Sequence, residues 1–384
     1  MGLIEHYDVA VMGAGGMGSA AIYHLAQRGV SVCGIDRFGL VHDRGSSHGE
    51  TRIIRKAYLE HPDYVPLLDR AYELWDELEA ESEAKLFTRC GLLALGHGES
   101  RVIRGQEACY AEYDLPHEVL EEDELRRRYP MLAIGDGWRA YHDPLGGFLG
   151  VEDCVRQHLD LAQKRGAVLY AGERVLGWQA EGDSVRIETD KRHIAAGRLV
   201  LAAGPWAAPE LCSLGIKTQV VRKVLFWYQG EGVEQYSLGK LPCFLVGEDG
   251  SPNTFYGFPA FGPWGLKVTE HNVMMHKVVE DPLKINRELE VDDEAPVRRF
   301  VDQFFPRLRA QRSRHVVCMY TMTPDEHFVV DKHPECAAVV LAAGFSGHGF
   351  KFSSVMGEIL ADLALEGKTS QPIDFLRLGR FASR

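Results

Sequence analysis

Residues 7–36 read YDVAVMGAGGMGSAAIYHLAQRGVSVCGID, and this stretch decides the fold of the chain. An apolar strand over residues 7–12 enters a glycine-rich turn, and a helical repeat of apolar residues follows the turn. A second strand over residues 30–35 then ends at Asp36. Strand, glycine-rich turn, helix and second strand in this order predict a Rossmann-like βαβ unit at the start of an α/β domain.

Four residues within this unit have the positions that dinucleotide binding requires. Gly13 allows the tight turn, Gly15 lets the backbone approach a pyrophosphate, and Gly18 permits close packing of the helix on the strand. Asp36 stands where an acidic side chain bonds a ribose hydroxyl. The pattern therefore predicts a bound adenine dinucleotide, and it does not distinguish NAD from FAD.

A second glycine-rich stretch, AAGFSGHGFKF, covers residues 342–352. An apolar run over residues 337–343 precedes it, and apolar residues at helical spacing follow it as far as Gly367. The helix that begins here has unpaired N–H groups and a positive dipole end, which favour negative charge in front of them. The same letters also fit an ordinary connection between a strand and a helix, with no ligand.

Composition excludes several classes of protein. The chain has 384 residues, 45% of them hydrophobic, which is enough for two domains with substantial cores. Its formal net charge of -12 argues against nucleic acid or an anionic membrane surface as the main partner, because both favour an excess of Lys and Arg. No apolar run approaches the ~20 residues that span a bilayer, so we expect no membrane partner.

The eight cysteines are scattered, with no CxxC pair and no histidine-rich partner segment. This spacing favours neither a metal site nor a disulfide framework. A reducing cytoplasm fits such cysteine usage best.

Two further regions bear on function. Residues 44–55 are dense in Gly, Ser and charge, which indicates a ligand-facing loop that runs into a short strand. Arg52 and Arg55 flank two isoleucines, so we expect them to be partly buried and to need anionic partners. Residues 219–317 are rich in aromatic and β-forming residues, and we expect this region to form a substrate domain.

Several motifs together resemble the family of monomeric sarcosine oxidase and N-methyltryptophan oxidase, flavoproteins of the D-amino-acid-oxidase type. These motifs are the N-terminal fingerprint, HGETRIIR at 48–55, YGFPAFGPWGLK at 256–267, CMYT and PDEHF within 318–328, and GFSGHGFKFSS at 344–354. The resemblance covers nearly the whole chain and keeps the order of the family's motifs.

The resemblance implies an α/β fold with a discontinuous Rossmann-like FAD-binding domain and an α+β substrate domain built on a mixed sheet. The FAD-binding domain would comprise residues 1–85, 150–215 and 318–384. The substrate domain would comprise residues 86–149 and 216–317.

The resemblance also implies a covalent FAD, joined through a thioether from its 8α-methyl group to Cys318. By itself this residue would be read as a buried apolar cysteine. The cofactor-binding residues implied in addition are Gly13, Gly15, Gly18, Asp36, Ser46, Thr51, Val175, Gly204, Gly347, His348, Gly349 and Lys351.

For the substrate, the resemblance implies that Arg55 and Lys351 bind a carboxylate, a task suited to the planar fork of arginine and the point charge of lysine. It places Tyr256 and His271 near the substrate amine. It places Lys267 beside flavin N5, where a fixed cation stabilises the charge that develops as oxygen is reduced. The other implied site residues are Arg52 and His48 near the flavin, and Tyr320, Leu245 and Gly347 at the substrate.

The activity implied is that of an FAD-dependent oxidase of secondary amino acids. It would demethylate N-methyl amino acids with molecular oxygen to give a primary amino acid, formaldehyde and hydrogen peroxide, as a cytoplasmic monomer. Leu245 stands where sarcosine oxidase has methionine, and residues 226–229 lean towards N-methyltryptophan oxidase. A larger or cyclic substrate, such as N-methyltryptophan, pipecolate, proline or a glycated amino acid, therefore stays open, as does a dehydrogenase with another electron acceptor.

Overall fold

The predicted βαβ unit is present in the computed structural model, which describes residues 4–248, 250, 253–271 and 277–382. It consists of β1 (Ile4–Met12), α1 (Gly16–Gln27) and β2 (Val32–Asp36), and the two strands pair in parallel. The second strand begins two residues later than predicted. Gly29 closes the helix end, because its backbone φ of 77° is left-handed and its N–H donates to the carbonyl oxygen of Ala26 at 3.0 Å.

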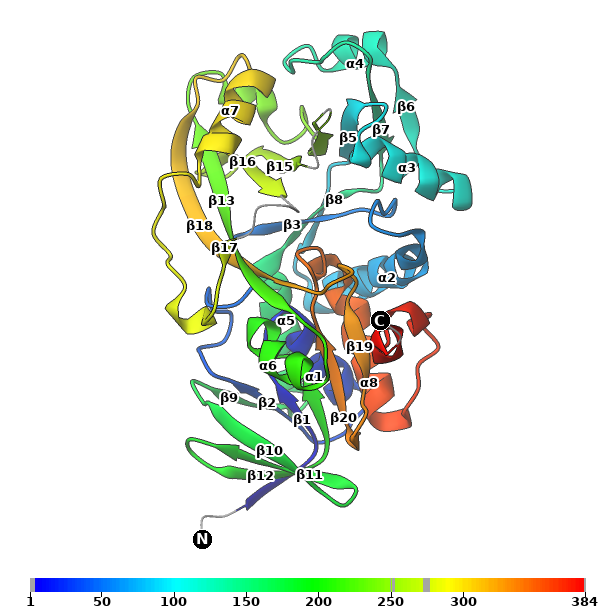
Figure 1. Cartoon of the computed structure of the whole chain (residues 1–384), viewed down its shortest axis with the longest axis vertical. Coiled ribbons are helices and arrows are strands. Elements are labelled where there is room, and N and C mark those ends of the chain that lie inside the picture. Colours follow the sequence, from blue (N-terminus) through cyan, green and yellow to red (C-terminus); the bar gives the residue numbers. More distant parts are fainter. Residues whose placement is uncertain (1–3, 249, 251–252, 272–276, 383–384) are drawn as a thin grey trace.

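This unit belongs to an eight-stranded sheet, the nucleotide sheet, at the bottom of Figure 1. Six of its strands follow the order β10-β11-β12-β1-β2-β9. Strand β20 pairs with β12 in parallel, and β19 pairs with β20. The strands beyond the βαβ unit are β9 (Val168–Ala171), β10 (Val175–Glu181), β11 (Ser184–Thr189), β12 (His193–Leu201), β19 (Val329–His333) and β20 (Cys336–Ala343). Segments from the beginning, middle and end of the chain thus form one sheet.

Helices cover both faces of the nucleotide sheet. On one face, α1 and α2 each contact both α5 and α8, and the four helices share one apolar core. The other face has its own apolar cluster, which includes Leu211 of α6. These helices are α2 (Val65–Ser82), α5 (Val151–Lys164), α6 (Ala208–Ser213) and α8 (Ser353–Glu366).

A nine-stranded mixed sheet, the upper sheet, lies at the top of Figure 1. Its order is β17-β13-β16-β15-β14-β5-β7-β6, with β18 paired to β13, and only β5 and β14 pair in parallel among its described strands. The strands are β5 (Leu92–His97), β6 (Glu118–Leu120), β7 (Trp138–Asp143), β13 (Gln219–Gln229), β14 (Cys243–Gly247), β15 (Thr254–Phe261), β16 (Gly265–His271), β17 (Lys277–Val278) and β18 (Gln311–Met322). Helices α3 (Arg101–Glu112), α4 (Glu122–Arg128) and α7 (Ala295–Phe304) accompany it.

A small antiparallel sheet joins the two layers. It consists of β3 (Thr51–Ile54), β8 (Gly147–Gly150) and β4 (Phe87–Arg89), in the order β3-β8-β4. The long strands β13 and β18 also run from the upper layer towards the lower one (Figure 1). The predicted fold class, an α/β nucleotide domain beside a mixed-sheet layer, is confirmed.

Two features are absent from the described residues. None of their helices has both the length and the apolar character needed to cross a membrane. No group of three or more His, Cys, Asp or Glu side chains within the described part of the chain could hold a metal ion.

Candidate active site

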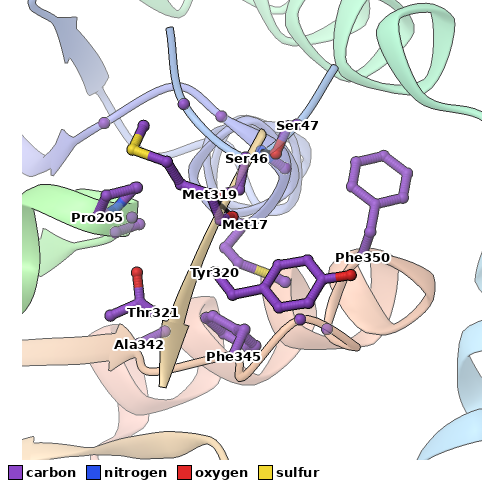
Figure 2. A pocket seen from close by; sticks show the side chains of 18 of the residues that line it. Met17, Ser46, Ser47, Pro205, Met319, Tyr320, Thr321, Ala342, Phe345 and Phe350 are labelled. Carbon is purple, nitrogen blue, oxygen red and sulfur yellow. Dashed lines mark hydrogen bonds between the residues drawn. The ribbon is translucent and has the colours of Figure 1, made fainter. Parts of the chain in front are cut away.

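A cavity of about 440 Å³ lies where the two layers meet. At one end, the cavity is lined by the turn between β1 and α1 and by the end of β2. At the other end, it is lined by Leu245, Tyr256 and His271 of the upper sheet. Figure 2 shows Ser46 and Ser47, Met319 to Thr321 of β18, and Phe345 of the C-terminal loop around one space. This volume falls within the range of pockets for small molecules and cofactors.

The nucleotide end of the cavity is built from backbone turns. The Asp36 carboxylate accepts hydrogen bonds from the N–H groups of Ala14 and Phe38, both at 2.9 Å, which fix the turn after β1 to the end of β2. A Cβ atom added at Gly13 would lie 2.5 Å from the carbonyl oxygen of Ala202, so this turn needs glycine. Gly18 is also required, since its Cβ would lie 1.7 Å from the carbonyl oxygen of Gly13.

The cavity wall suits a dinucleotide such as FAD. At Gly15 an added Cβ would meet only Ser47 Oγ, at 3.7 Å, and at Gly204 it would meet nothing within 4 Å. Both glycines line the cavity, so bare backbone faces the ligand space. Two further wall atoms, Arg55 Nε and Trp206 Nε1, are buried donors without a hydrogen-bond partner among the described residues. Buried donors of this kind call for a ligand acceptor.

The C-terminal glycine-rich loop lines the cavity opposite the N-terminal turn. Its backbone is left-handed at Gly344, Ser346 and Gly347, with φ values of 63°, 44° and 82°. A Cβ at Gly347 would lie 2.4 Å from the Tyr320 ring, and one at Gly349 would lie 2.5 Å from the Phe345 ring. Close packing of the loop on these two aromatic rings therefore requires both glycines.

The two predicted carboxylate-binding residues, Arg55 and Lys351, both line the cavity. Arg55 Nη2 donates to Glu60 Oε2 at 2.8 Å, and the exposed fractions of the two side chains are 4% and 12%. Burial raises the pKa of Glu60, but Arg55, His348 and Lys351 outweigh it and lower this pKa to about 2. Glu60 was not predicted, because only the folded chain shows that its carboxylate reaches Arg55.

Lys351 is held within the same group. Its Nζ donates to the carbonyl oxygen of His348 at 2.7 Å and to the Tyr58 hydroxyl at 3.3 Å. Burial, with the nearby charge of Arg55, lowers the pKa of Lys351 to about 7. Two cationic side chains thus face one carboxylate, Glu60, and this part of the cavity favours a singly charged anion.

The aromatic end of the cavity brings together Tyr256, His271 and Tyr320, as predicted, with Leu245 beside them. The His271 ring centroid lies 5.7 Å from that of Tyr320 and 6.4 Å from that of Tyr256. Burial lowers the pKa of His271 to about 3, so its ring is neutral near pH 7. A neutral imidazole offers one donor and one acceptor to a ligand.

Lys267 is fully buried behind this wall. Its Nζ donates to the carbonyl oxygen of Gly49 at 2.6 Å, and to the carbonyl oxygen and Oγ1 of Thr51 at 3.1 and 3.0 Å. The ammonium also lies 4.8 Å from the ring centroid of Trp227 and 4.7 Å from that of Phe258. Burial lowers the pKa of Lys267 well below its usual value.

Cys318 lies next to the cavity-lining Met319, in contact with two predicted flavin neighbours. Arg52 Nη2 donates to Cys318 Sγ at 3.5 Å, and the His48 side chain lies beside the thiol. Burial raises the pKa of the thiol, but His48 and the Arg52 guanidinium together outweigh it and lower this pKa to about 6. A thiolate is the reactive form of cysteine.

The predicted residues thus divide into a cavity wall and a layer behind it. The wall contains Gly13, Gly15, Asp36, Ser46, Arg52, Arg55, Val175, Gly204, Leu245, Tyr256, His271, Tyr320, Gly347, His348, Gly349 and Lys351. Gly18, His48, Thr51, Lys267 and Cys318 lie outside the wall. The sequence reading missed Glu60, Arg101 and Trp206, which also line the cavity, because each is an ordinary loop or helix-end residue in the sequence.

Comparison with known proteins gives consistent matches over the whole length. The family model described as "FAD dependent oxidoreductase" matches residues 8–363. The chain is 42% identical over 381 residues to monomeric sarcosine oxidase of Bacillus sp. (strain B-0618), covering 98% of this chain and 96% of that protein. It is 34% identical over 379 residues to N-methyl-L-tryptophan oxidase of Yersinia pestis (strain Pestoides F), covering 98% and 99%. The solved structure of NikD, described as an unusual amino acid oxidase essential for nikkomycin biosynthesis, matches with a TM-score of 0.84 at 25% identity and covers 97% of both chains.

Proposed function

The chain belongs to the family of FAD-dependent oxidoreductases, and on that premise we propose that it oxidises small N-methyl amino acids such as sarcosine. It is a flavin-dependent amine oxidase of the sarcosine oxidase kind. One observation supports an amino acid as the substrate. Arg55 and Lys351, two buried cations opposed by one carboxylate, lie in the same cavity as the neutral His271.

The cation pair would bind the substrate carboxylate. Glu60 occupies Nη2 of Arg55 and leaves its Nε without a partner among the described side chains and backbone. Lys351 reaches the same space, and burial lowers its pKa to about 7. An incoming carboxylate supplies the counter-charge that favours the ammonium form of Lys351, so binding itself would complete the pair.

The aromatic end would hold the amine. Because His271 is neutral near pH 7, it adds no positive charge that would compete with a secondary amine, and its ring can accept an N–H. Tyr256 and Tyr320 keep their hydroxyl protons, since burial raises the pKa of both. These three side chains would orient the N-methyl group and exclude water from it.

When bound, FAD supplies the two-electron acceptor for amine oxidation. On the protein side, Lys267 Nζ donates to the carbonyl oxygen of Gly49 and to the carbonyl oxygen and Oγ1 of Thr51, and three acceptors favour its protonated form against the effect of burial. In this form Lys267 would stabilise the negative charge that develops when molecular oxygen is reduced to hydrogen peroxide. Arg52 and His48, next to Thr51 and Cys318, would lie along the flavin.

Cys318 would attach the cofactor covalently through its sulfur, as an 8α-S-cysteinyl FAD. Its lowered pKa and the adjacent Arg52 support this proposal, because a nucleophilic thiolate is the form needed for attachment.

The same proposal extends to the organisation of the chain. Residues 1–85, 150–215 and 318–384 would form the FAD-binding domain, and residues 86–149 and 216–317 the substrate domain. The nucleotide sheet and the upper sheet lie largely within these two sets of segments, which supports the division. We propose further that the enzyme is a cytoplasmic monomer.

Product analysis tests the proposed reaction. In air, sarcosine should be converted to glycine, formaldehyde and hydrogen peroxide in equal amounts. Arg55→Gln should raise KM for sarcosine by about 100-fold, because a hydrogen bond to a charged group contributes up to about 3 kcal/mol. Arg104→Gln, at an arginine whose side chain is 65% exposed, is the matched control and should leave KM unchanged. Turnover of N-methyltryptophan but not of sarcosine would overturn the small-substrate proposal.

A further inference from the structure

Cys90 and Cys243 bring two thiols together behind the cavity wall. They are 153 residues apart in the sequence, and their Sγ atoms lie 3.7 Å apart. Pairing of β5 with β14 creates this contact: Cys243 opposes Leu92 in the parallel register, and its N–H donates to the carbonyl oxygen of Gly91 at 3.1 Å. The two sulfur atoms therefore face each other because of the ladder between two strands.

The two thiols differ in exposure and in acidity. Cys90 is partly exposed and Cys243 is buried. The hydrogen bond with Cys243 lowers the pKa of the Cys90 thiol, whereas burial raises the pKa of Cys243 well above its usual value. A thiolate reacts with oxidants and a thiol does not, so Cys90 is the sulfur that reacts first. Cys243 is placed to react second.

The surroundings place this pair close to the proposed site of oxygen reduction. Cys243 packs in one apolar cluster with Leu245 and Phe258, and Cys90 packs against the same cluster. Phe258 is the residue whose ring lies 4.7 Å from the Lys267 ammonium, and the charge of Lys267 also reaches Cys243. If peroxide forms beside Lys267, it forms close to this dithiol; this step rests on the proposed function.

We propose that Cys90 and Cys243 form a peroxide-sensitive dithiol that closes to a disulfide. The Cys90 thiolate attacks hydrogen peroxide, the O–O bond breaks, and Cys90 becomes a sulfenic acid while one oxygen leaves as water after taking up a proton. The sulfur of Cys243 then attacks the Cys90 sulfur, an S–S bond forms, and the S–O bond breaks. The hydroxide that leaves takes the Cys243 proton and departs as a second water.

Closure requires the sulfur atoms to approach from 3.7 Å to about 2 Å. Cys243 and Leu245 are two residues apart on β14 and share one face of the strand. Leu245 lines the cavity, so a shift at Cys243 is transmitted to the wall beside the substrate. The disulfide thus provides a way for accumulated peroxide to alter the site.

Peptide mapping after treatment with hydrogen peroxide tests the pair on the FAD-loaded enzyme without substrate. A peptide cross-linked between Cys90 and Cys243 should appear, about two free thiols per chain should be lost, and dithiothreitol should restore both. Cys90→Ser should abolish the cross-link. Cys212→Ser, which removes an exposed thiol elsewhere, is the matched control and should leave it intact.

Two outcomes would overturn the proposal: oxidation of Cys90 to a sulfinic acid with Cys243 still free, or thiol loss confined to Cys212. Cys243→Ser should also abolish the cross-link; should this variant fail to fold, Cys90→Ser and the wild-type mapping still decide the question. Turnover of sarcosine in air, without added peroxide, should give the same cross-link. If added peroxide closes the bond and sarcosine yields no peroxide, the dithiol is supported and the proposed function alone fails.

Discussion

The charges of the cavity depend on three side chains whose pKa values are all lowered, with a different consequence for the charge of each. Glu60 is held ionised by Arg55, His271 is held neutral by burial, and Lys351 has a pKa of about 7. Lys351 is therefore the member of this group whose charge changes near neutral pH. The neighbouring Lys223, with a pKa lowered by burial to about 8, is the other candidate for such a change.

The affinity for a carboxylate should fall as pH rises through 7. Lys351 is cationic below its pKa of about 7 and neutral above it, so the cation that attracts the ligand is lost on the alkaline side. We expect the inhibition constant of propionate, which has a carboxylate and no amine, to rise by up to about tenfold per pH unit between pH 7.5 and 9. In Lys351→Gln this slope should disappear. Lys223→Gln is the control and should keep it; a slope that survives in Lys351→Gln would contradict the assignment.

Lys267→Met should separate the two halves of the reaction. Because Lys267 is proposed to act on oxygen, the variant should slow reoxidation of the reduced enzyme by about 100-fold or more. Its anaerobic reduction by sarcosine should change far less. Stopped-flow absorbance records both steps, and equal losses in the two half-reactions would refute the role given to Lys267.

Cys318 should keep the flavin attached after denaturation. Acid precipitation of the wild-type enzyme should leave the yellow colour in the pellet, whereas Cys318→Ala should release it to the supernatant. Absorbance of the two fractions measures the ratio. Colour in the wild-type supernatant would exclude a covalent bond at this residue.

At the scale of elements, a buried ion pair joins β13 to the loop before α7. Arg222 Nη1 lies 2.8 Å from both carboxylate oxygens of Asp293, and the exposed fraction of each side chain is 4%. Arg222 also donates to the carbonyl oxygens of Asn286 and Glu288. Lys277 of β17 approaches Asp293 at 2.8 Å from the other side. This cluster fixes the 286–293 segment against the edge of the upper sheet.

Asp293→Asn should destabilise the fold by about 3 kcal/mol, because it leaves a buried guanidinium without its counter-ion. Asp136→Asn, at a fully exposed carboxylate, should change stability by less than about 0.5 kcal/mol. Urea unfolding at pH 7 measures both. Burial raises the pKa of Asp293, but Lys277 and Arg222 outweigh it and lower this pKa below its usual value. Its contribution is therefore complete above about pH 4 and is lost as pH falls further. Equal losses in the two variants would contradict this account.

Elements encoded locally were predictable from the sequence. The turn after β1 and the loop before α8 have glycine spacings that specify their backbone, and both lie where the sequence places them. Arg55 and Lys351 were predicted as wall residues through the resemblance of their motifs. The partner of Arg55 was not predicted, because Glu60 lies in a surface-like segment whose carboxylate turns inward only in the fold. The Cys90–Cys243 contact was missed for the same reason, since it depends on the register of two distant strands.

At the scale of the whole molecule, the two layers make one site that neither could make alone. The nucleotide sheet supplies Gly15, Asp36 and the C-terminal loop with Lys351. The upper sheet supplies Tyr256, His271 and the buried Lys267. The small sheet between them, which includes β3 (Figure 1), carries Arg52 and leads to Arg55, and side chains from both layers line the cavity.

The central claim is that an N-methyl amino acid gives its electrons to the flavin in this cavity. Anaerobic titration with sarcosine, followed by flavin absorbance, tests it most directly. The account predicts complete bleaching by sarcosine, and much weaker bleaching by glycine, proline, pipecolate and glycated amino acids. An enzyme whose flavin stays oxidised with sarcosine and N-methyltryptophan, and is bleached by one of the others, would contradict it.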